Sequence, residues 1–209
     1  MTDALATSST SNPRSRAARL VAIVVPLLGV MLAGLLVWHN SRTYHLATVQ
    51  EGVLYRDGLK SRAQFGATLD RIHPKTVVSL IDENELADPR KPQLAAEAEL
   101  CSQRGITLDR IPVKLGGWPT SDDIRKFLAI VNDKQSQPVL VHCAQGVRRT
   151  GIFVAAYEES VLGWDKEKTK DAVLSFGHRT DTVNDIKRFI DGYDPKAETV
   201  PGDLGHGSE

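Results

Sequence analysis

The segment Pro138-Val-Leu-Val-His-Cys-Ala-Gln-Gly-Val-Arg-Arg-Thr-Gly151 decides the fold, because it joins an apolar run to a glycine-containing loop and then to a helical pattern. The apolar residues 138–142 predict a buried strand, and the spacing after Gly151 predicts a helix over 151–161. A strand, a loop and a helix in this order are typical of parallel α/β sheets. Such sheets bind ligands beyond the carboxyl ends of their strands, so this loop is the expected site.

The side chains of the loop indicate chemistry on a phosphate group. A reactive cysteine needs a lowered pKa, and inward-facing loop N–H groups together with the positive end of a helix beginning near Thr150 would lower that of Cys143. Gly146 allows a tight curve. Arg149, separated from Cys143 by five residues, can bind an oxyanion with two parallel hydrogen bonds. We therefore expect Cys143 to attack phosphorus and form a phosphocysteine, with the Thr150 hydroxyl donating to the departing sulfur.

The stretch HCAQGVRRTG resembles the HCxxGxxRT signature of the cysteine-based protein tyrosine phosphatases, in particular their small dual-specificity branch. The resemblance covers most of residues 50–193. It implies that Cys143 is the nucleophile, that Arg149 and the loop amides bind phosphate, and that His142 and Thr150 support them. The resulting phosphate-binding set is Ala144, Gln145, Gly146, Val147, Arg148 and Arg149. Of these, Arg148 is expected to point outward, toward a second anionic group or toward solvent.

The sequence departs from this family at the general acid. Dual-specificity phosphatases usually carry an aspartate about thirty residues before the cysteine, which protonates the leaving oxygen. The corresponding place holds Val113-Lys-Leu115. Asp122 is therefore the candidate acid, while Asp123 with Thr120 fits a capping box. Asp82, at the end of a predicted strand, is the reserve candidate.

The rest of the chain predicts an α/β domain over residues 46–193, with a mostly parallel central sheet flanked by helices. Apolar runs predict strands, and apolar residues at helical spacing predict helices. The expected strands are 53–56, 76–81 and 106–113, besides 138–142. The expected helices are 62–72, 93–104, 120–131, 166–176 and 181–193, besides 151–161. Residues 194–209 are rich in acids, Gly and Pro, and are expected to form a disordered tail.

The N-terminal region predicts a membrane anchor. Residues 20–38 contain no charged side chain, and at 1.5 Å per residue they approach the thickness of a bilayer core of about 30 Å. No A-x-A pattern follows, so a cleaved signal peptide is the less favoured alternative. Arginines at 14, 16 and 19 would keep the N-terminus, with a disordered leader at 1–19, in the cytoplasm. The catalytic domain of such a single-pass protein would be extracytoplasmic, and periplasmic in a bacterium.

Composition excludes several other classes of protein. The chain has 209 residues, with 26 Lys+Arg, 26 Asp+Glu and two cysteines. Zero net charge argues against a nucleic-acid binder, and two cysteines exclude a disulfide framework. Because the six histidines are scattered, we expect neither a metal site nor a cofactor. Cys101 is either a buried structural residue or a resolving cysteine for Cys143.

Two alternatives to a phosphatase remain open. A rhodanese-like sulfurtransferase also uses a loop cysteine at a helix start, and Cys143 to Arg148 fits its shorter Cys-x-x-Gly-x-Arg loop. A non-catalytic phosphate-binding module would explain the missing acid. The sequence does not distinguish phosphotyrosine, phosphoserine or phosphothreonine in a protein from a phosphorylated lipid or inositol, and it leaves the oligomeric state undetermined.

Overall fold

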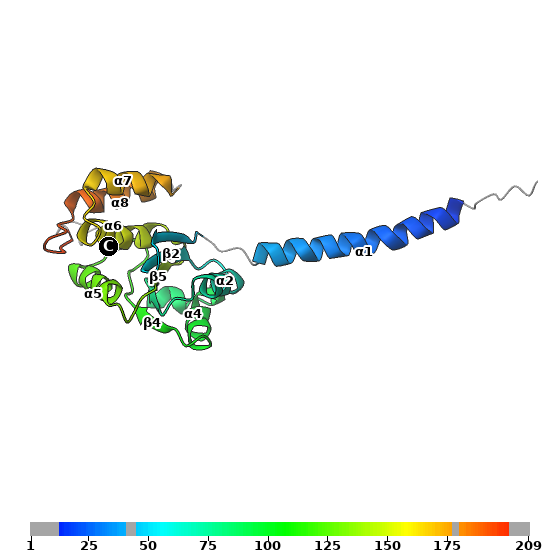
Figure 1. The fold of residues 1–209 in the computed structure, drawn as a ribbon, viewed down its shortest axis with the longest axis horizontal. Coiled ribbons are helices and arrows are strands. Elements are labelled where there is room, and N and C mark those ends of the chain that lie inside the picture. Colours follow the sequence, from blue (N-terminus) through cyan, green and yellow to red (C-terminus); the bar gives the residue numbers. More distant parts are fainter. Residues whose placement is uncertain (1–12, 41–44, 177–179, 201–209) are drawn as a thin grey trace, which may run out of the picture. The chain divides into compact units, whose positions relative to one another are not determined.

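The computed structural model describes residues 13–40, 45–176 and 180–200. The chain divides into two units, 1–41 and 42–209, of which the first contains one long helix and the second the α/β domain (Figure 1). The helices are α1 Pro13–Asn40, α2 Arg62–Ile72, α3 Glu83–Leu86, α4 Pro92–Ser102, α5 Ser121–Asn132, α6 Arg148–Ser160, α7 Lys166–Ser175 and α8 Thr180–Gly192. The strands are β1 Ala47–Gln50, β2 Leu54–Gly58, β3 Thr76–Ser79, β4 Thr107–Arg110 and β5 Val139–Cys143.

The five strands form one sheet in the order β1-β2-β5-β3-β4. β2, β5, β3 and β4 are parallel to one another, and β1 is an edge strand antiparallel to β2. The α/β class and the mostly parallel sheet are as the sequence predicts. Because β5 is the central strand, its last residue, Cys143, lies at the middle of the carboxyl edge, where such sheets bind ligands.

Alternating side chains of the strands supply two separate cores. Val78, Val139 and Val141 pack with α5, α6 and α8, whereas Val77 and Leu140 pack with α2 and α4. Figure 1 accordingly shows α6, α7 and α8 on one side of the sheet and α2 and α4 on the other. Two covered faces explain why the central strands are almost continuously apolar in sequence.

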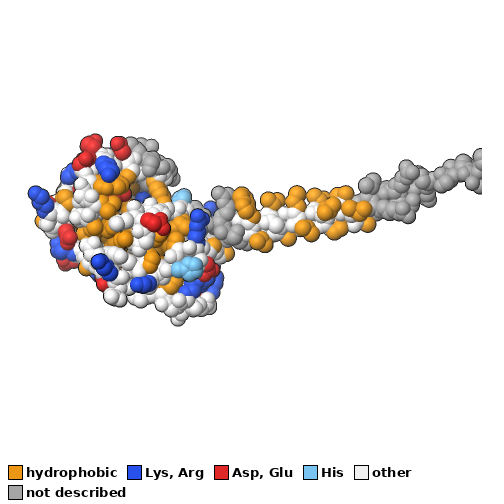
Figure 2. Space-filling model, viewed as in Figure 1, with side chains coloured by type: hydrophobic (Ala, Val, Ile, Leu, Met, Phe, Trp, Pro, Cys, Tyr) orange, Lys and Arg blue, Asp and Glu red, His pale blue; other side chains and the backbone are white. Residues whose placement is uncertain are grey.

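The helix of the first unit, α1, exposes apolar side chains along residues 22–38, the part for which side chains are described (Figure 2). A membrane span needs about 20 consecutive apolar residues. Over the described residues, no helix has both the length and the apolar character required to cross a bilayer. This finding corrects three predictions: the transmembrane anchor at 20–38, the membrane as a partner, and the single-pass localisation with an extracytoplasmic domain.

Other differences from the predicted elements are local. α1 begins at Pro13, inside the predicted leader, while residues 1–12 lie outside the described residues. In the predicted tail, Asp194 pairs with Thr199, and the Val200 amide donates to the Ser121 hydroxyl at 2.9 Å. Residues 201–209 again lie outside the described part. The sequence did not predict β1 or the four-residue helix α3, and α3 contributes directly to the site.

Candidate active site

The loop after β5 is shaped by a close backbone approach from the end of β2. Gly146 has φ +71°, and a Cβ there would lie 2.4 Å from the carbonyl oxygen of Asp57. A Cβ on Gly58 would lie 2.6 Å from the Gln145 backbone. Both positions therefore require glycine, and β2 forms the support on which the loop curves. The loop leads into α6 at Arg148, so Arg149 and Thr150 lie in the first turn of that helix.

Cys143 is buried at the base of this loop, and the Gly146 amide donates to its Sγ at 3.2 Å. Burial, the largest influence, raises the pKa of the thiol, but the charge of Arg149, the Thr150 hydroxyl and amide, and the Gly146 amide together hold that pKa below its ordinary value. A lowered pKa favours the thiolate, which is the nucleophilic form. The structure thus brings together Cys143, Gly146, Arg149 and Thr150.

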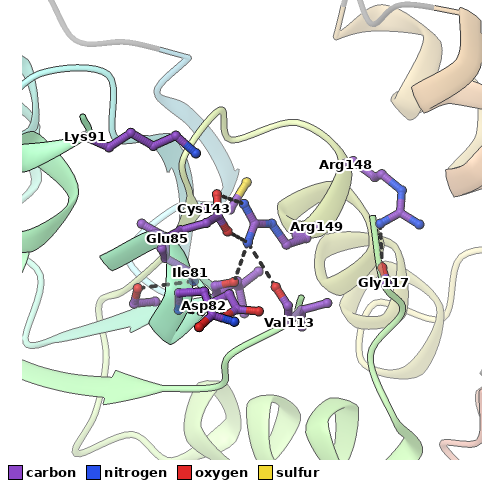
Figure 3. A network of polar contacts seen from close by, with 12 residues as sticks. Ile81, Asp82, Glu85, Lys91, Val113, Gly117, Cys143, Arg148 and Arg149 are labelled. Carbon is purple, nitrogen blue, oxygen red and sulfur yellow. Dashed lines mark hydrogen bonds and ion pairs between the residues drawn. The ribbon is translucent and has the colours of Figure 1, made fainter. Parts of the chain in front are cut away.

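Arg149 is held beside the thiol by a carboxylate that sequence analysis missed. Its Nη1 and Nη2 donate to the two oxygens of Glu85 at 2.5 Å and 3.2 Å, and Nη1 also reaches the carbonyls of Leu80 and Val113 at 3.2 Å and 3.0 Å. Figure 3 shows these contacts converging on the guanidinium. The Arg149 and Glu85 side chains are both buried. This bidentate pair fixes the plane of the guanidinium before any ligand binds.

Asp82, the reserve candidate for the acid, caps the short helix that carries Glu85. It is the N-cap of α3, where its Oδ1 accepts from the Asn84 amide at 2.8 Å. That cap starts the short helix directly after β3 and orients Glu85 toward Arg149. An acid three residues after a capping aspartate, at the carboxyl end of a strand, is the sequence signal that could have indicated this residue.

His142 lies on the opposite face of β5 from Cys143. Its Nε2 is 3.3 Å from Oε2 of the fully buried Glu97, and its ring packs against Phe65 with the centroids 4.6 Å apart. Glu97 also accepts from the Ser79 hydroxyl at 2.9 Å and pairs with Arg110 at 2.6 Å. His142 therefore contacts the Glu97 side of β5 and not the face that carries Cys143, and its supporting role stays a prediction.

Arg148 is directed away from Cys143, but its polar atoms bind protein groups and not the second anionic group or the solvent that the sequence analysis expected. Nη1 donates to the Gly117 carbonyl at 2.6 Å and Nε to Asp185 at 2.6 Å, while the guanidinium lies 4.5 Å from the centre of the Trp118 ring. Figure 3 shows the contact with Gly117. Arg148 thus fastens the loop after β4 to α6 and α8.

Asp122 is not brought into the site. Its side chain is 89% exposed and pairs with Arg125 at 2.5 Å. Asp123 forms the predicted capping box with Thr120. Cys101 lies in the core on the α2 and α4 side of the sheet, whereas Cys143 belongs to the other core. The structure therefore shows no contact that would make Cys101 a partner of Cys143.

A cavity of about 460 Å³ opens above Cys143. Its base includes Cys143, Ala144, Gln145 and Arg149. Its remaining walls include Lys60, Glu85, Lys91, Gln93, Leu94, Leu115, Gly116, Arg148 and Thr182. Figure 3 shows the Lys91 side chain extending toward Cys143. Within the described residues, no group of three or more His, Cys, Asp or Glu side chains is arranged to hold a metal ion.

Asp57, beneath the loop, gives the domain a testable pH dependence. Burial raises its pKa to about 7, against the opposing effects of Thr68, the Gly58 amide and His142. An unfolded aspartate titrates near 3.9, so this group contributes stability at low pH that is lost as the pH rises toward 7. We expect the free energy of unfolding of Asp57→Asn, relative to wild type, to rise by about 1.4 kcal/mol per pH unit between pH 5 and 7 and to level off above. Urea titrations of both proteins from pH 5 to 8 measure this difference, and a constant difference would contradict it.

Comparison of the sequence with known proteins identifies the family of this chain. The profile of a family described as "DSP-PTPase phosphatase fused to NAD+ Kinase" matches residues 49–188. The dual specificity protein phosphatase TpbA of Pseudomonas aeruginosa is 31% identical over 150 residues, which cover 68% of this chain and 59% of TpbA. The chain thus spans less than two thirds of that relative.

Solved structures show the same fold. A crystal structure of a TpbA variant from P. aeruginosa in complex with phosphotyrosine has a TM-score of 0.54 and 25% identity, with 74% of this chain and 87% of that chain covered. The core catalytic domain of the PP-IP phosphatase SIW14 from S. cerevisiae has a TM-score of 0.59 and 23% identity, covering 73% and 87% of the two chains. At 23% identity, the similarity to SIW14 shows a shared fold alone.

Proposed function

The chain belongs to the DSP-PTPase family of cysteine-based phosphatases, and from this premise we propose that it hydrolyses phosphate monoesters through a phosphocysteine on Cys143. The observation that supports this most is the setting of the Cys143 Sγ, which accepts from the Gly146 amide at 3.2 Å and lies beside an Arg149 guanidinium held in a buried bidentate pair; this setting lowers the pKa of the thiol. The thiolate supplies the nucleophile, while Arg149 and the loop amides bind the charge that develops on the phosphoryl oxygens.

In the proposed first step, the Cys143 sulfur forms a bond to phosphorus while the bond from phosphorus to the ester oxygen breaks. That oxygen leaves with the electron pair and takes a proton from water. In the second step, water attacks phosphorus and gives up a proton to solvent, the phosphorus–sulfur bond breaks, and the sulfur departs as a thiolate stabilised by Thr150 and the Gly146 amide. Lys60 and Lys91 in the cavity wall attract the phosphate dianion as it enters.

The cavity favours a leaving group that departs without a strong general acid. Of the described residues that line it, Glu85 is the only carboxylate, and both of its oxygens accept from Arg149. A phenol is a better leaving group than an alkyl alcohol, because its oxygen needs less protonation as the bond breaks. We therefore place phosphotyrosine ahead of phosphoserine and phosphothreonine, in line with the phosphotyrosine complex of TpbA.

Rapid acid quenching during turnover of p-nitrophenyl phosphate tests this proposal. Mass spectrometry is expected to find a phosphoryl group on the peptide that contains Cys143, and turnover is expected to persist in EDTA. Formation of thiocyanate from thiosulfate and cyanide, without phosphate release, would instead support the sulfurtransferase alternative. Binding of phosphate analogues without turnover at any pH would support the non-catalytic module.

The variant Asp122→Asn tests whether Asp122 acts as the general acid despite its exposed position. Because the Asp122 side chain is exposed and pairs with Arg125, we expect kcat to change far less than the roughly 100-fold that loss of a general acid costs. The measurement compares wild type and variant on p-nitrophenyl phosphate and on an alkyl phosphate. A large loss confined to the alkyl phosphate would show that Asp122 reaches the leaving oxygen during turnover.

A further inference from the structure

Two carbonyl groups of the phosphate-binding loop are held from behind by side chains that belong to neither the loop nor the cavity. Nδ1 of His45 lies 2.8 Å from the Gln145 carbonyl oxygen and donates to it. Nη2 of Arg56 donates to the Gly146 carbonyl oxygen at 2.9 Å. Neither His45 nor Arg56 lines the cavity above Cys143.

The geometry of the peptide bond links these contacts to the thiol. In a planar trans peptide, the C=O and the following N–H point in opposite directions. A Gln145 carbonyl held by His45 therefore turns the Gly146 amide the other way, and that amide donates to Sγ of Cys143 at 3.2 Å. By the same rule, a Gly146 carbonyl held by Arg56 turns the Val147 amide away from Arg56, toward the inside of the loop.

Arg56 is placed to act by charge as well. It is 5% exposed and lies in β2, paired in register with Val141 of β5. Burial lowers its pKa to about 10, while the charges of Cys143 and Glu158 act in the opposite direction, so the guanidinium is cationic at neutral pH. Its charge attracts a Cys143 thiolate from behind the loop.

Phe176 joins the two contacts into one cluster. The Arg56 guanidinium lies 3.8 Å from the centre of the Phe176 ring, and the His45 ring meets Phe176 edge-on, with the centroids 6.3 Å apart. We refer to His45, Arg56 and Phe176 as the rear clamp. Its members come from three separate parts of the domain, which is why no local sequence pattern indicates it.

We propose that His45 and Arg56 are positioning residues, which hold the 145–146 and 146–147 peptides with their N–H groups turned toward Cys143 and the bound anion. This inference rests on the proposed function for the identity of that anion, a phosphoryl group. Arg56 sets both the loop conformation and part of the charge that stabilises the thiolate. His45 affects only the loop conformation and adds no charge beside the thiolate.

The decisive variant is Arg56→Met combined with Glu158→Gln, because the second change prevents a buried carboxylate from losing its counter-charge. Iodoacetate inactivation rates across pH give the pKa of the Cys143 thiol, and orthovanadate inhibition gives anion affinity. We expect the thiol pKa to rise by about one unit and vanadate affinity to fall about 10-fold or more. Glu158→Gln alone and Arg104→Met, whose arginine pairs with Asp70 away from the cavity, are expected to match wild type.

His45 offers a rescue test. Its φ is +60°, a conformation that both glycine and asparagine tolerate. His45→Gly removes the donor and is expected to weaken vanadate binding with little change in the thiol pKa. His45→Asn restores an N–H donor near the position of Nδ1 and is expected to recover most of the affinity.

The outcomes separate this inference from the proposed function. Unchanged thiol pKa and vanadate affinity in the folded Arg56 double variant would overturn the positioning role, even if its melting temperature fell. Equal vanadate affinity in His45→Gly and His45→Asn would overturn the role of His45. If wild type turned over no phosphate ester while the Arg56 variant still raised the thiol pKa and weakened vanadate binding, the proposed function would fail and the positioning role would stand.

Discussion

Cys143→Ser is expected to eliminate phosphatase turnover, with a loss of about 10⁴-fold or more in kcat, because removal of a nucleophile leaves only binding and oxyanion stabilisation. A serine hydroxyl at this position is not converted to an oxyanion by the environment that lowers the pKa of the thiol. The phosphocysteine intermediate then cannot form.

The same variant is expected to bind orthophosphate or vanadate with an affinity close to that of wild type. The loop amides, Arg149 and its pairing with Glu85 do not depend on the sulfur. Isothermal titration with orthophosphate measures this binding, and p-nitrophenyl phosphate assays measure turnover. Retention of full activity in Cys143→Ser would refute the cysteine mechanism, whereas loss of both activity and anion binding would show that the substitution had disturbed the loop.

The shape of the loop between β5 and α6 could be predicted from the sequence because the residues that form it are contiguous. Cys143, Gly146, Arg149 and Thr150 are neighbours in the chain, and the geometry of a strand, a tight loop and a helix start is local. The alternating apolar residues of the strands likewise follow from burial on two faces. These are features that a short stretch of chain determines by itself.

The groups that hold the loop could not be predicted in the same way. Glu85 lies 64 residues from Arg149 on a helix of four residues, too short to show a periodic pattern. Arg56 and His45 meet the loop across 90 and 100 residues. Asp122 was the candidate acid because residues 113–115 hold no acid, yet the helix that begins at Ser121 directs its side chain to solvent.

Glu85→Gln is expected to weaken both turnover and anion binding, although Glu85 itself touches no phosphoryl oxygen in the proposed mechanism. A glutamine keeps one acceptor for Arg149 but removes the charge and the second acceptor of the bidentate pair. Breaking a buried ion pair by neutralising one member costs about 3–5 kcal/mol of stability. The free energy of unfolding should therefore fall together with kcat/KM.

The variant Arg149→Lys separates the contribution of the planar guanidinium geometry from the contribution of the positive charge. The lysine ammonium keeps the positive charge beside Cys143. Its three donors cannot replace the bonds of Arg149 to both oxygens of Glu85 and to the two backbone carbonyls. It also cannot present two parallel donors to a phosphoryl group. We expect kcat to fall by about 100–1,000-fold, the range seen when one oxyanion donor is removed, with the thiol pKa changed much less.

Kinetics of wild type, Arg149→Lys and Glu85→Gln on one aryl phosphate, together with iodoacetate inactivation across pH, separate these effects. Arg149→Lys should lose transition-state stabilisation while its thiol alkylates with a pH profile near that of wild type. Glu85→Gln should retain more activity than Arg149→Lys, because its arginine still reaches the Leu80 and Val113 carbonyls. Near wild-type kcat in Arg149→Lys would mean that charge alone suffices, and the pair formed by Glu85 and Arg149 would then contribute to stability rather than to catalysis.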